Sequence, residues 1–399
     1  MKYNLIRLSN SLDPHATFKK EDDEFIANIN NELYDDDITL VENSEERFNI
    51  IFVETGGSEQ HFIKIADKLK KPILLLSTSK NNSLPACFEI KTFLKQKYNI
   101  EPFFAFGEPN EIANYLRNIS KVFQGVQFVE GKNLGVIGQP SDWLIASKVD
   151  NKRVKEVYDI NLIDIPSDEL KEEINKGLLK DIPNKDKYAK LAKDPKVYQG
   201  ALEIYSGLKR VIEKHNLTGL TIRCFDLIGE YKNTACLALA MLNDEGITSA
   251  CEGDVPSLLT MFFIRGLTGK SSFQANPSLI NLKDNSVLFA HCTIPMGMCN
   301  NVEFMTHFES GLGIGIRGKL QEGRVTVLKL SPNLKDCLAI EGNIASNPEH
   351  KEYCRTQIEV KLENEELYEL LNNNFGNHVI ITYENISIIF HAFLSYYFD

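Results

Sequence analysis

The chain has 399 residues, of which 43% are hydrophobic and 25% are charged, and its formal net charge is -11 at pH 7. This length exceeds one ordinary hydrophobic core, so we expect two or three domains, and the composition argues against disorder and fibrous structure. The acidic balance repels a phosphate backbone, so nucleic acid is not expected as a partner.

The N-terminal stretch MKYNLIRLSNSLDPHATFKK becomes polar after a few residues, so it lacks the apolar core of a signal peptide. No window of the sequence approaches the roughly 20 apolar residues that a membrane-spanning helix needs. Eight cysteines are spread along the chain without a CxxC pair, which is typical of a reducing compartment. We therefore expect a cytoplasmic protein with no membrane partner.

The first region alternates apolar strands with helical patterns. We expect strands in FNIIFVETGG (48–57), KPILLLSTS (71–79) and EPFFAFG (101–107). Helical patterns follow them in HFIKIADKLK (61–70), CFEIKTFLKQKY (87–98) and EIANYLRNISKVFQG (111–125). Strict alternation of strand and helix predicts a parallel sheet with helices on its faces. We expect this α/β domain to comprise residues 1–131.

A second α/β series begins with the strand LGVIG, which is followed by the loop GQPSDW (138–143). The charged stretch 168–213 is expected to be rich in helix. Further strands are predicted in GLTIRCFDLIG (219–229) and ITSACEGD (247–254), and helices in ACLALAMLNDEG (235–246) and VPSLLTMFFIRGLTG (255–269). This pattern predicts a second doubly wound domain, 132–285, whose ligands would bind outside the carboxyl ends of the strands.

The remaining residues, 286–399, carry short strands with turn signals. These strands are SVLFAHCTI, GLGIGIRGKL, GRVTVLKL and NHVIITYENISIIF. They predict a β-rich domain, either a sandwich or a barrel. The predicted fold class is therefore α/β, with two tandem doubly wound parallel-sheet domains followed by a C-terminal β-rich domain.

Two acidic residues follow the strand that ends at Cys251. Glu252 stands between a strand and a helix, where a carboxylate faces the ligand crevice of such a sheet. Asp254 lies two residues further, so in an extended chain both carboxylates point to one side and can share a cation. The alternatives are a structural salt bridge for Glu252 and a helix N-cap for Asp254, since Pro256 follows in the first turn.

Two histidines are candidates for the same site. His291 lies inside the apolar strand SVLFAHCTI, and His378 follows Gly376 and Asn377 at the start of another strand. Each histidine by itself is more often a structural residue that binds the backbone than a ligand. Their occurrence together with Glu252 is what favours a functional site.

Further polar residues are weaker candidates for contacts with a substrate. His307 and Glu309 in THFESGLGIG lie on one face of an extended segment, although polar residues usually lie on exposed faces. Trp143, the only tryptophan, is suited to stack on a sugar ring or to fill a core. The Gly-rich turn ETGGSE (54–59) is a third candidate. The glycines of GLGIGIRG are not followed by the helix that a dinucleotide site requires, so nucleotide binding is excluded there.

Four cysteines in the C-terminal part allow a second interpretation. Cys292, Cys299, Cys337 and Cys354 are irregularly spaced, whereas structural zinc sites usually have regular spacing. We therefore expect buried structural thiols.

Five short segments, taken together, resemble the L-fucose/L-arabinose isomerase family. They are CEGD (251–254), LTG (267–269), FQAN (273–276), LFAHCTIP (288–295) and GNH (376–378), in this order and spacing. The resemblance covers the second and third predicted domains by these segments and the first domain by its organisation.

The resemblance implies a site for a divalent cation, usually Mn²⁺, in which two carboxylates also move protons. The first carboxylate of the family is similar to Glu252, the C-terminal histidine to His378, and a strand histidine of the arabinose branch to His291. The second carboxylate position falls on Asn276, which offers a carbonyl oxygen but no charge and no base. The resemblance also implies homotrimers or homohexamers whose active sites are completed by a neighbouring subunit.

These observations predict a metal-dependent aldose–ketose isomerase that acts on a sugar or sugar derivative through an enediol. The predicted catalytic residues are Glu252 and Asp254, and the predicted metal ligands are Glu252, Asn276, His291 and His378. The predicted substrate contacts are Trp143, His307, Glu309 and Asn377. Because Asn276 replaces a carboxylate, a sugar-binding or regulatory protein on the same scaffold is the alternative, and an enzyme with another chemistry is a third hypothesis.

Overall fold

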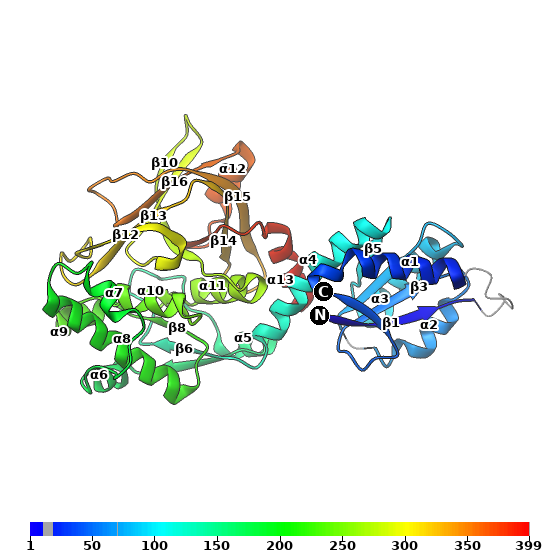
Figure 1. Cartoon of the computed structure of the whole chain (residues 1–399), viewed down its shortest axis with the longest axis horizontal. Coiled ribbons are helices and arrows are strands. Elements are labelled where there is room, and N and C mark those ends of the chain that lie inside the picture. The colour runs from blue at the N-terminus through cyan, green and yellow to red at the C-terminus, as the bar shows by residue number, and fades with distance from the viewer. Residues whose placement is uncertain (11–18, 70, 399) are drawn as a thin grey trace. The chain divides into compact units, whose positions relative to one another are not determined.

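The computed structural model describes residues 1–10, 19–69 and 71–398, and these form two compact units (Figure 1). The first unit comprises Met1–Phe123 together with the residues from Ser395 onward, and the second comprises Gln124–Leu394. Residues 11–18 of the polar N-terminal stretch and Lys70, at the end of a predicted helix, lie outside the described residues. The predicted division into domains 1–131, 132–285 and 286–399 stays a prediction.

The first unit is built on a five-stranded parallel sheet with the order β2-β1-β3-β4-β5. The strands are β1 Lys2–Leu8, β2 Thr39–Glu42, β3 Asn49–Val53, β4 Ile73–Ser77 and β5 Phe103–Phe106. The helices are α1 Lys19–Glu32, η1 Tyr34–Asp36, α2 Glu59–Ala66, α3 Ser83–Tyr98 and α4 Pro109–Val129. The sequence did not predict β1, because KYNLIRL mixes buried and partly exposed positions instead of forming the continuous apolar run of β4.

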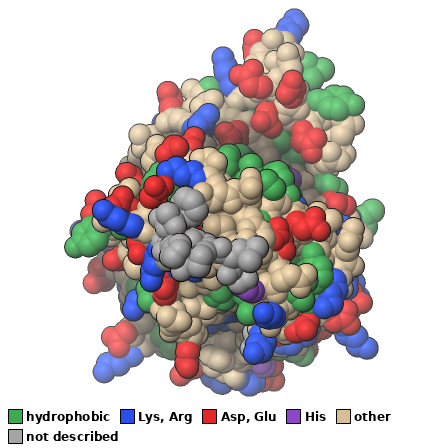
Figure 2. All heavy atoms as spheres, turned by 90° about the vertical axis from the view of Figure 1, so that its right-hand side faces the viewer, with side chains coloured by type: hydrophobic (Ala, Val, Ile, Leu, Met, Phe, Trp, Pro, Cys, Tyr) green, Lys and Arg blue, Asp and Glu red, His purple; other side chains and the backbone are tan. Residues whose placement is uncertain are grey.

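Charges of both signs are mixed on the face drawn in Figure 2. No extended basic patch gathers among the described side chains of that face.

The second unit begins with a four-stranded parallel sheet of the order β7-β6-β8-β9. Its strands are β6 Asn133–Ile137, β7 Asn161–Ile165, β8 Gly219–Ile222 and β9 Thr248–Cys251. Its helices are α5 Asn151–Tyr158, α6 Ser167–Ile174, α7 Lys185–Ala189, α8 Pro195–His215, α9 Phe225–Tyr231, α10 Cys236–Asp244 and α11 Val255–Thr268. The predicted strand 219–229 was wrong in its second half, which forms α9, because a short apolar run cannot be assigned by periodicity alone.

A closed antiparallel barrel follows, with the strand order β10-β11-β16-β15-β14-β17. Its strands are β10 Phe273–Asn281, β11 Ser286–His291, β14 Gly323–Leu330, β15 Cys337–Ser346, β16 Thr356–Leu362 and β17 Val379–Thr382. The remaining elements are η2 Met296–Met298, the pair β12 Cys299–Met305 and β13 Gly315–Leu320, α12 Asn364–Asn373 and α13 Ser387–Phe398. The fold class is thus α/β with a C-terminal β barrel, although the end of NHVIITYENISIIF begins α13 instead of continuing the strand.

Helix α11 connects the parallel sheet to the barrel. It contacts β8 and β9 of the sheet and β10, β14 and β17 of the barrel, and Figure 1 shows it between these layers. Its sequence is apolar around most of its circumference, as expected for a helix buried on all sides. Because Asp254 is its N-cap, the start of α11 fixes the position of the Glu252 turn. None of the helices in the described parts of the chain is long and apolar enough to cross a bilayer.

Asn243 at the end of α10 holds β9 in place. Its Nδ2 donates to the carbonyl oxygens of Leu239, at 2.9 Å, and Ser249, at 2.7 Å, while its Oδ1 accepts from the Ser249 N–H at 3.0 Å. The side chain is 2% exposed, so water cannot replace these bonds.

We predict that Asn243→Ala lowers the free energy of unfolding of this unit by about 2–3 kcal/mol, because buried backbone groups of Ser249 lose their partner. Denaturation in urea, followed by the fluorescence of Trp143 in the same unit, measures the change. Asn301→Ala, at an exposed position of β12 in the same unit, is the control and should change stability by less than about 0.5 kcal/mol. Equal midpoints for the Asn243 variant and the wild type would contradict this role.

Candidate metal centre

The turn after β9 carries the central carboxylate of the site. Glu252 has a φ of 65° and Gly253 a φ of 72°, in the left-handed region that favours glycine. Gly253 N–H donates to the carbonyl oxygen of Ile222, and Ser141 N–H donates to that of Glu252. The loop after β6 and the last residue of β8 therefore hold the turn, and Glu252 stands at the carboxyl ends of the parallel strands.

Two histidines from the barrel face this carboxylate. Glu252 Oε1 lies 3.6 Å from His291 Nε2 and 3.5 Å from His378 Nε2. His291 ends β11, and His378 directly precedes β17. All three side chains are buried, and one ligand atom from each lies within 4.8 Å of the others. One carboxylate and two imidazoles form a group that can hold a divalent metal ion.

The spacing of these atoms suits a cation better than direct hydrogen bonds. Contacts of 3.5 and 3.6 Å are long for a hydrogen bond. Two neighbouring ligands that each bind a metal at about 2.1 Å are themselves about 3.0–3.4 Å apart. The arrangement therefore needs only a small adjustment to accommodate an ion.

Trp143 orients the Glu252 carboxylate. The Trp143 Nε1–H donates to Glu252 Oε2 at 2.7 Å, which leaves Oε1 for the two imidazoles. The indole ring packs edge-on against Phe225, with ring centroids 4.8 Å apart, and Phe225 in turn packs against His307 at 5.5 Å. A single indole therefore links the carboxylate to a row of ring systems.

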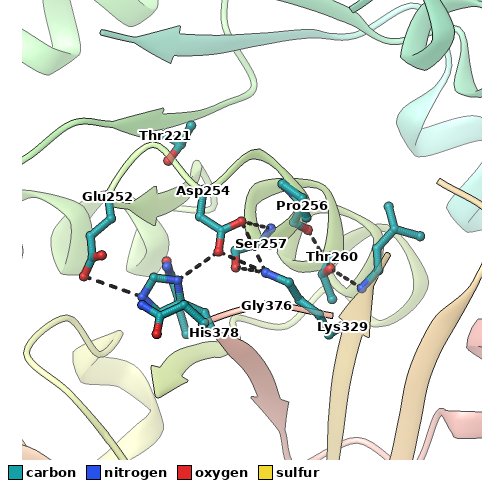
Figure 3. A network of polar contacts seen from close by, with 12 residues as sticks. Thr221, Glu252, Asp254, Pro256, Ser257, Thr260, Lys329, Gly376 and His378 are labelled. Atoms are coloured by element: carbon teal, nitrogen blue, oxygen red, sulfur yellow. Dashed lines mark hydrogen bonds and ion pairs between the residues drawn. The ribbon is translucent and has the colours of Figure 1, made fainter. Parts of the chain in front are cut away.

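The hydrogen bonds of His378 determine which of its nitrogens can bind a metal. His378 Nδ1 lies 2.9 Å from Asp254 Oδ2, and because an ionised carboxylate only accepts, Nδ1 carries the proton (Figure 3). His378 Nε2 is buried and has no hydrogen-bond partner. In the neutral ring its lone pair faces Glu252 Oε1, and two such electron-rich atoms repel each other unless a proton or a metal ion lies between them. The residues present therefore fit a bound cation.

His291 is held in the opposite way. The Thr293 N–H donates to His291 Nδ1 at 3.2 Å, so the neutral ring carries its proton on Nε2. In that state Nε2 is a donor toward Glu252. Coordination through this nitrogen requires the other tautomer and the loss of the bond from Thr293.

The ionisation of these groups follows from burial and from their neighbours. Burial favours a neutral Glu252, but the close imidazoles of His291 and His378 and their charges outweigh it and hold the pKa of this carboxyl well below its usual range. Burial by itself would lower the pKa of His378, but Asp254 and Glu252 raise it to about 9. The pKa of His291 is lowered, chiefly by burial. In the metal-free site a proton is thus favoured on His378 Nε2, and a metal ion that binds this nitrogen has to displace it.

A cavity of about 380 Å³ opens beside the three residues. Predicted site residues on its wall are Trp143, Glu252, Asn276, His291, His307, Glu309 and Asn377. A larger cavity of about 940 Å³, lined by residues of α7, η2 and the end of α11, contains none of them. The convergence of ionisable groups, and not the cavity size, therefore locates the candidate site.

Comparison with known proteins supports a relation to sugar isomerases. No family model matches the chain. The chain is 24% identical over 310 residues to the sulfoquinovose isomerase of Alkalicoccus urumqiensis, which covers 72% of this chain and 69% of that protein. It is 22% identical over 366 residues to the sulfoquinovose isomerase of Priestia megaterium, covering 84% of this chain and 80% of that protein. A third sulfoquinovose isomerase, from Clostridium sp., is 33% identical over 92 residues, covering 23% of this chain and 21% of that protein.

Two predicted residues lie behind the cavity wall instead of lining it. Asp254 is fully buried: it caps α11 through the Ser257 N–H and binds His378 and Lys329. His378 is 0% exposed and faces Glu252 Oε1 through its Nε2, at 3.5 Å. The predicted catalytic role of Asp254 would therefore have to act through His378.

The other predicted residues lie where a substrate can meet them. Asn276 Nδ2 donates weakly to the Asn377 carbonyl oxygen at 3.5 Å, and both residues line the cavity. Burial and the charge of Glu252 raise the pKa of Glu309. Burial lowers the pKa of His307 to about 4, so this ring is neutral at pH 7. ETGGSE lies in the first unit, and its contribution to a pocket stays a prediction.

Sequence reasoning did not find Lys329, Thr293, Phe225 or Glu352. Lys329 alone carried a usable signal, because it lies inside the apolar strand GRVTVLKL, where a charged residue needs a partner. Cys292 and Cys354 also line the cavity, a location that their spacing did not indicate.

We predict that Gly253→Ala destabilises the protein by more than the strain of a positive φ alone would. A Cβ there would lie 2.7 Å from both the Gln139 carbonyl oxygen and Pro140 Cα, so the loop that carries Trp143 must move. The expected loss is about 2–4 kcal/mol of unfolding free energy. Gly269→Ala is the matched control, because Gly269 has a φ of 69° but no atoms within 4 Å of an added Cβ. It should cost only about 1–2 kcal/mol. Similar losses in both variants, measured by thermal unfolding, would show that the loop contact is unimportant.

Proposed function

We propose that this protein is a divalent-metal-dependent isomerase that interconverts an aldose and a ketose. The observation that carries the proposal is the buried Glu252 carboxylate, which lines a cavity and faces the unpartnered Nε2 of His378. The similarity to proteins named sulfoquinovose isomerase supports the same reaction type. Mn²⁺ is the proposed cofactor.

Glu252 and His378 are the proposed principal ligands. Glu252 offers Oε1 and His378 offers Nε2, while His291 joins them if its proton moves to Nδ1. The Asn276 amide oxygen is the proposed fourth group, since a neutral carbonyl oxygen is an acceptable ligand for a hard cation. A divalent cation, when bound, supplies charge that polarises a carbonyl group and lowers the cost of forming an enediol.

The isomerisation also needs a group that takes a proton from one carbon and returns it to the next. Glu252 and Glu309 both reach the cavity. The lowered pKa of Glu252 makes it a weak base and a good ligand, whereas the raised pKa of Glu309 makes it the stronger base of the two. We therefore propose Glu309 as a second candidate for the proton transfer that the sequence assigned to Glu252.

The cavity wall combines stacking and polar surfaces in the way that a sugar requires. Trp143, Phe225 and His307 form a row of rings against which the C–H groups of a sugar can pack. Asn276, Asn377 and Thr293 provide polar groups near this row. Each of these groups can exchange hydrogen bonds with a sugar hydroxyl.

The charge of the cavity favours an uncharged sugar. Glu252, Glu309 and Glu352 line it, whereas neither lysine nor arginine is among its described lining residues. The similar proteins are named for sulfoquinovose, a sugar with a sulfonate group, and this wall offers no cationic side chain to bind one. From the side chains that one subunit brings to the cavity, we propose a neutral aldose as the substrate.

We also propose that the active form is a homotrimer or homohexamer with shared active sites. Trp143 is 51% exposed and Ile145 is 92% exposed in the loop beside the cavity. A neighbouring subunit can cover such exposed side chains. The number of subunits is what the resemblance to the L-fucose/L-arabinose isomerase family implies.

Asn276 is the observation behind a second candidate function. An amide at this position brings neither charge nor a base, so a protein that binds a sugar without converting it is the alternative. The two functions differ in whether a C–H bond of the sugar is broken.

We predict that the purified protein with Mn²⁺ converts at least one neutral aldose to its ketose and exchanges the C2 proton for deuterium in heavy water, as detected by NMR. Glu252→Gln should lose bound metal and turnover together. Glu309→Gln should keep the metal and lose at least about 100-fold in kcat. Sulfonated and phosphorylated sugars are included in the same panel.

Sugar-dependent thermal stabilisation without ketose or deuterium exchange would favour the binding protein instead. Turnover of a sulfonated sugar in preference to its neutral counterpart would contradict the proposed substrate class.

We predict that Asn276→Asp strengthens Mn²⁺ binding by about tenfold, because a carboxylate adds a charge where the wild type has an amide. Calorimetric titration measures the affinity. Asn377→Asp, a neighbouring residue on the same wall, is the control for a general gain of negative charge. An equal gain in both variants would show that Asn276 is not near the ion.

A further inference from the structure

Lys329 is a charged residue with no route to solvent. It lies in β14, in the sequence GRVTVLKL, and is 1% exposed. Its Nζ lies 3.2 Å from Asp254 Oδ1, 3.0 Å from Asp254 Oδ2 and 2.7 Å from Ser257 Oγ (Figure 3). A fully buried ion pair is often no better for stability than an apolar pair of similar volume. Stability alone therefore does not explain why a lysine occupies this position.

The contacts of Lys329 fix the orientation of Asp254. The ammonium group binds both carboxylate oxygens from one side, and the Ser257 N–H binds Oδ1 at 2.9 Å. The remaining direction of Oδ2 points to His378 Nδ1, at 2.9 Å. Asp254 is thus held from α11 and from β14 at once, and it has one orientation in which to accept the proton of His378.

Lys329 and Asp254 do not line the cavity, so neither touches a substrate there. Beyond the turn that Asp254 shares with Glu252, their side-chain contact with the site is the imidazole of His378. A hydrogen bond at Nδ1 fixes the ring tautomer and its direction and makes the other nitrogen a better ligand.

We propose that Lys329 is a positioning residue of the metal centre. It holds Asp254 in place, Asp254 holds the proton of His378 on Nδ1, and Nε2 is thereby kept as the ligand atom that faces Glu252. This inference rests on the proposed metal site, but it concerns metal affinity and not the identity of the sugar.

A structural role and a positioning role have different consequences. If Lys329 only stabilises the fold, its replacement lowers the melting temperature of the metal-free protein and leaves the Mn²⁺ affinity of the folded protein unchanged. If it positions His378, the affinity falls even where stability is preserved.

The chain offers a matched control on the same two elements. Thr260 Oγ1 in α11 accepts from the N–H of Leu330, the residue next to Lys329, at 3.0 Å. Thr260→Val removes this buried contact between α11 and β14 without touching Asp254 or His378.

The test is a calorimetric titration of each full-length variant with Mn²⁺, together with thermal unfolding in EDTA. Lys329→Met should weaken Mn²⁺ binding by about 10–100-fold.

Because that variant leaves the Asp254 charge buried alone and can fail to fold, Lys329→Met/Asp254→Asn removes both charges. The double variant should fold and still bind weakly, since a neutral amide holds the His378 proton poorly. Thr260→Val should be less stable but should bind Mn²⁺ like the wild type.

A milder variant keeps all charges in place. Ser257→Ala removes one contact of the Lys329 ammonium group and should weaken Mn²⁺ binding by about 2–5-fold. In all proteins, ¹⁵N NMR of labelled histidine reports which nitrogen of His378 carries the proton. In the metal-free proteins at a pH above the His378 pKa of about 9, where the ring is neutral, the wild type should show the proton on Nδ1 and the double variant should show a mixture.

Wild-type Mn²⁺ affinity in the double variant and in Ser257→Ala would overturn the inference while leaving the proposed isomerase intact. A wild-type protein that binds no Mn²⁺ would overturn both. Bound metal without any sugar conversion would contradict only the proposed function.

Discussion

The structure of the site depends on one turn, in which three consecutive residues join the parallel sheet to helix α11. Glu252 faces the cavity, Gly253 adopts a conformation with almost no room for a side chain, and Asp254 caps the helix. The same Asp254 binds Lys329 and His378, which belong to the barrel side of the unit. The carboxyl end of a sheet strand, the start of a buried helix and the start of a barrel strand are thereby held at one point.

The charges of this buried network explain its preference for a cation. Glu252 and Asp254 are both held ionised, whereas Lys329 provides only one positive charge, mainly to Asp254. Burying an uncompensated carboxylate is costly, so the position between Glu252 and His378 favours either a proton on Nε2 or a metal ion. The two histidines are not equivalent there, because His378 donates through Nδ1 and His291 accepts through it. This difference cannot be seen from a count of ligand residues.

The candidate site also departs from the pattern that the sequence resembles. Asn276 lies on the cavity wall in place of a carboxylate, while Glu309 and Glu352 bring carboxylates to the same wall from other segments. A carboxylate on a different segment can preserve the total charge of a site. It changes, however, which atom can accept a proton. The similar proteins share 22–24% identity with this chain over their longest matches, so substitutions of this kind are expected between them.

The sequence by itself determined that strands and helices alternate in the two sheets, since buried strands and amphipathic helices have their own periodicity, but it did not indicate β1, β2 or β7. It also indicated Glu252, His291 and His378. A charged or polar residue inside an apolar strand or at its end is unusual and can be recognised from the neighbouring sequence alone. It misassigned residues 223–229 and the end of the chain, where short apolar runs fit a strand and a helix equally well. Only the tertiary structure decided which nitrogen of each histidine faces Glu252, that Asp254 lies behind the wall, and that Lys329 of a distant strand holds it. These features depend on contacts between residues 75 and 124 positions apart, which no local pattern records.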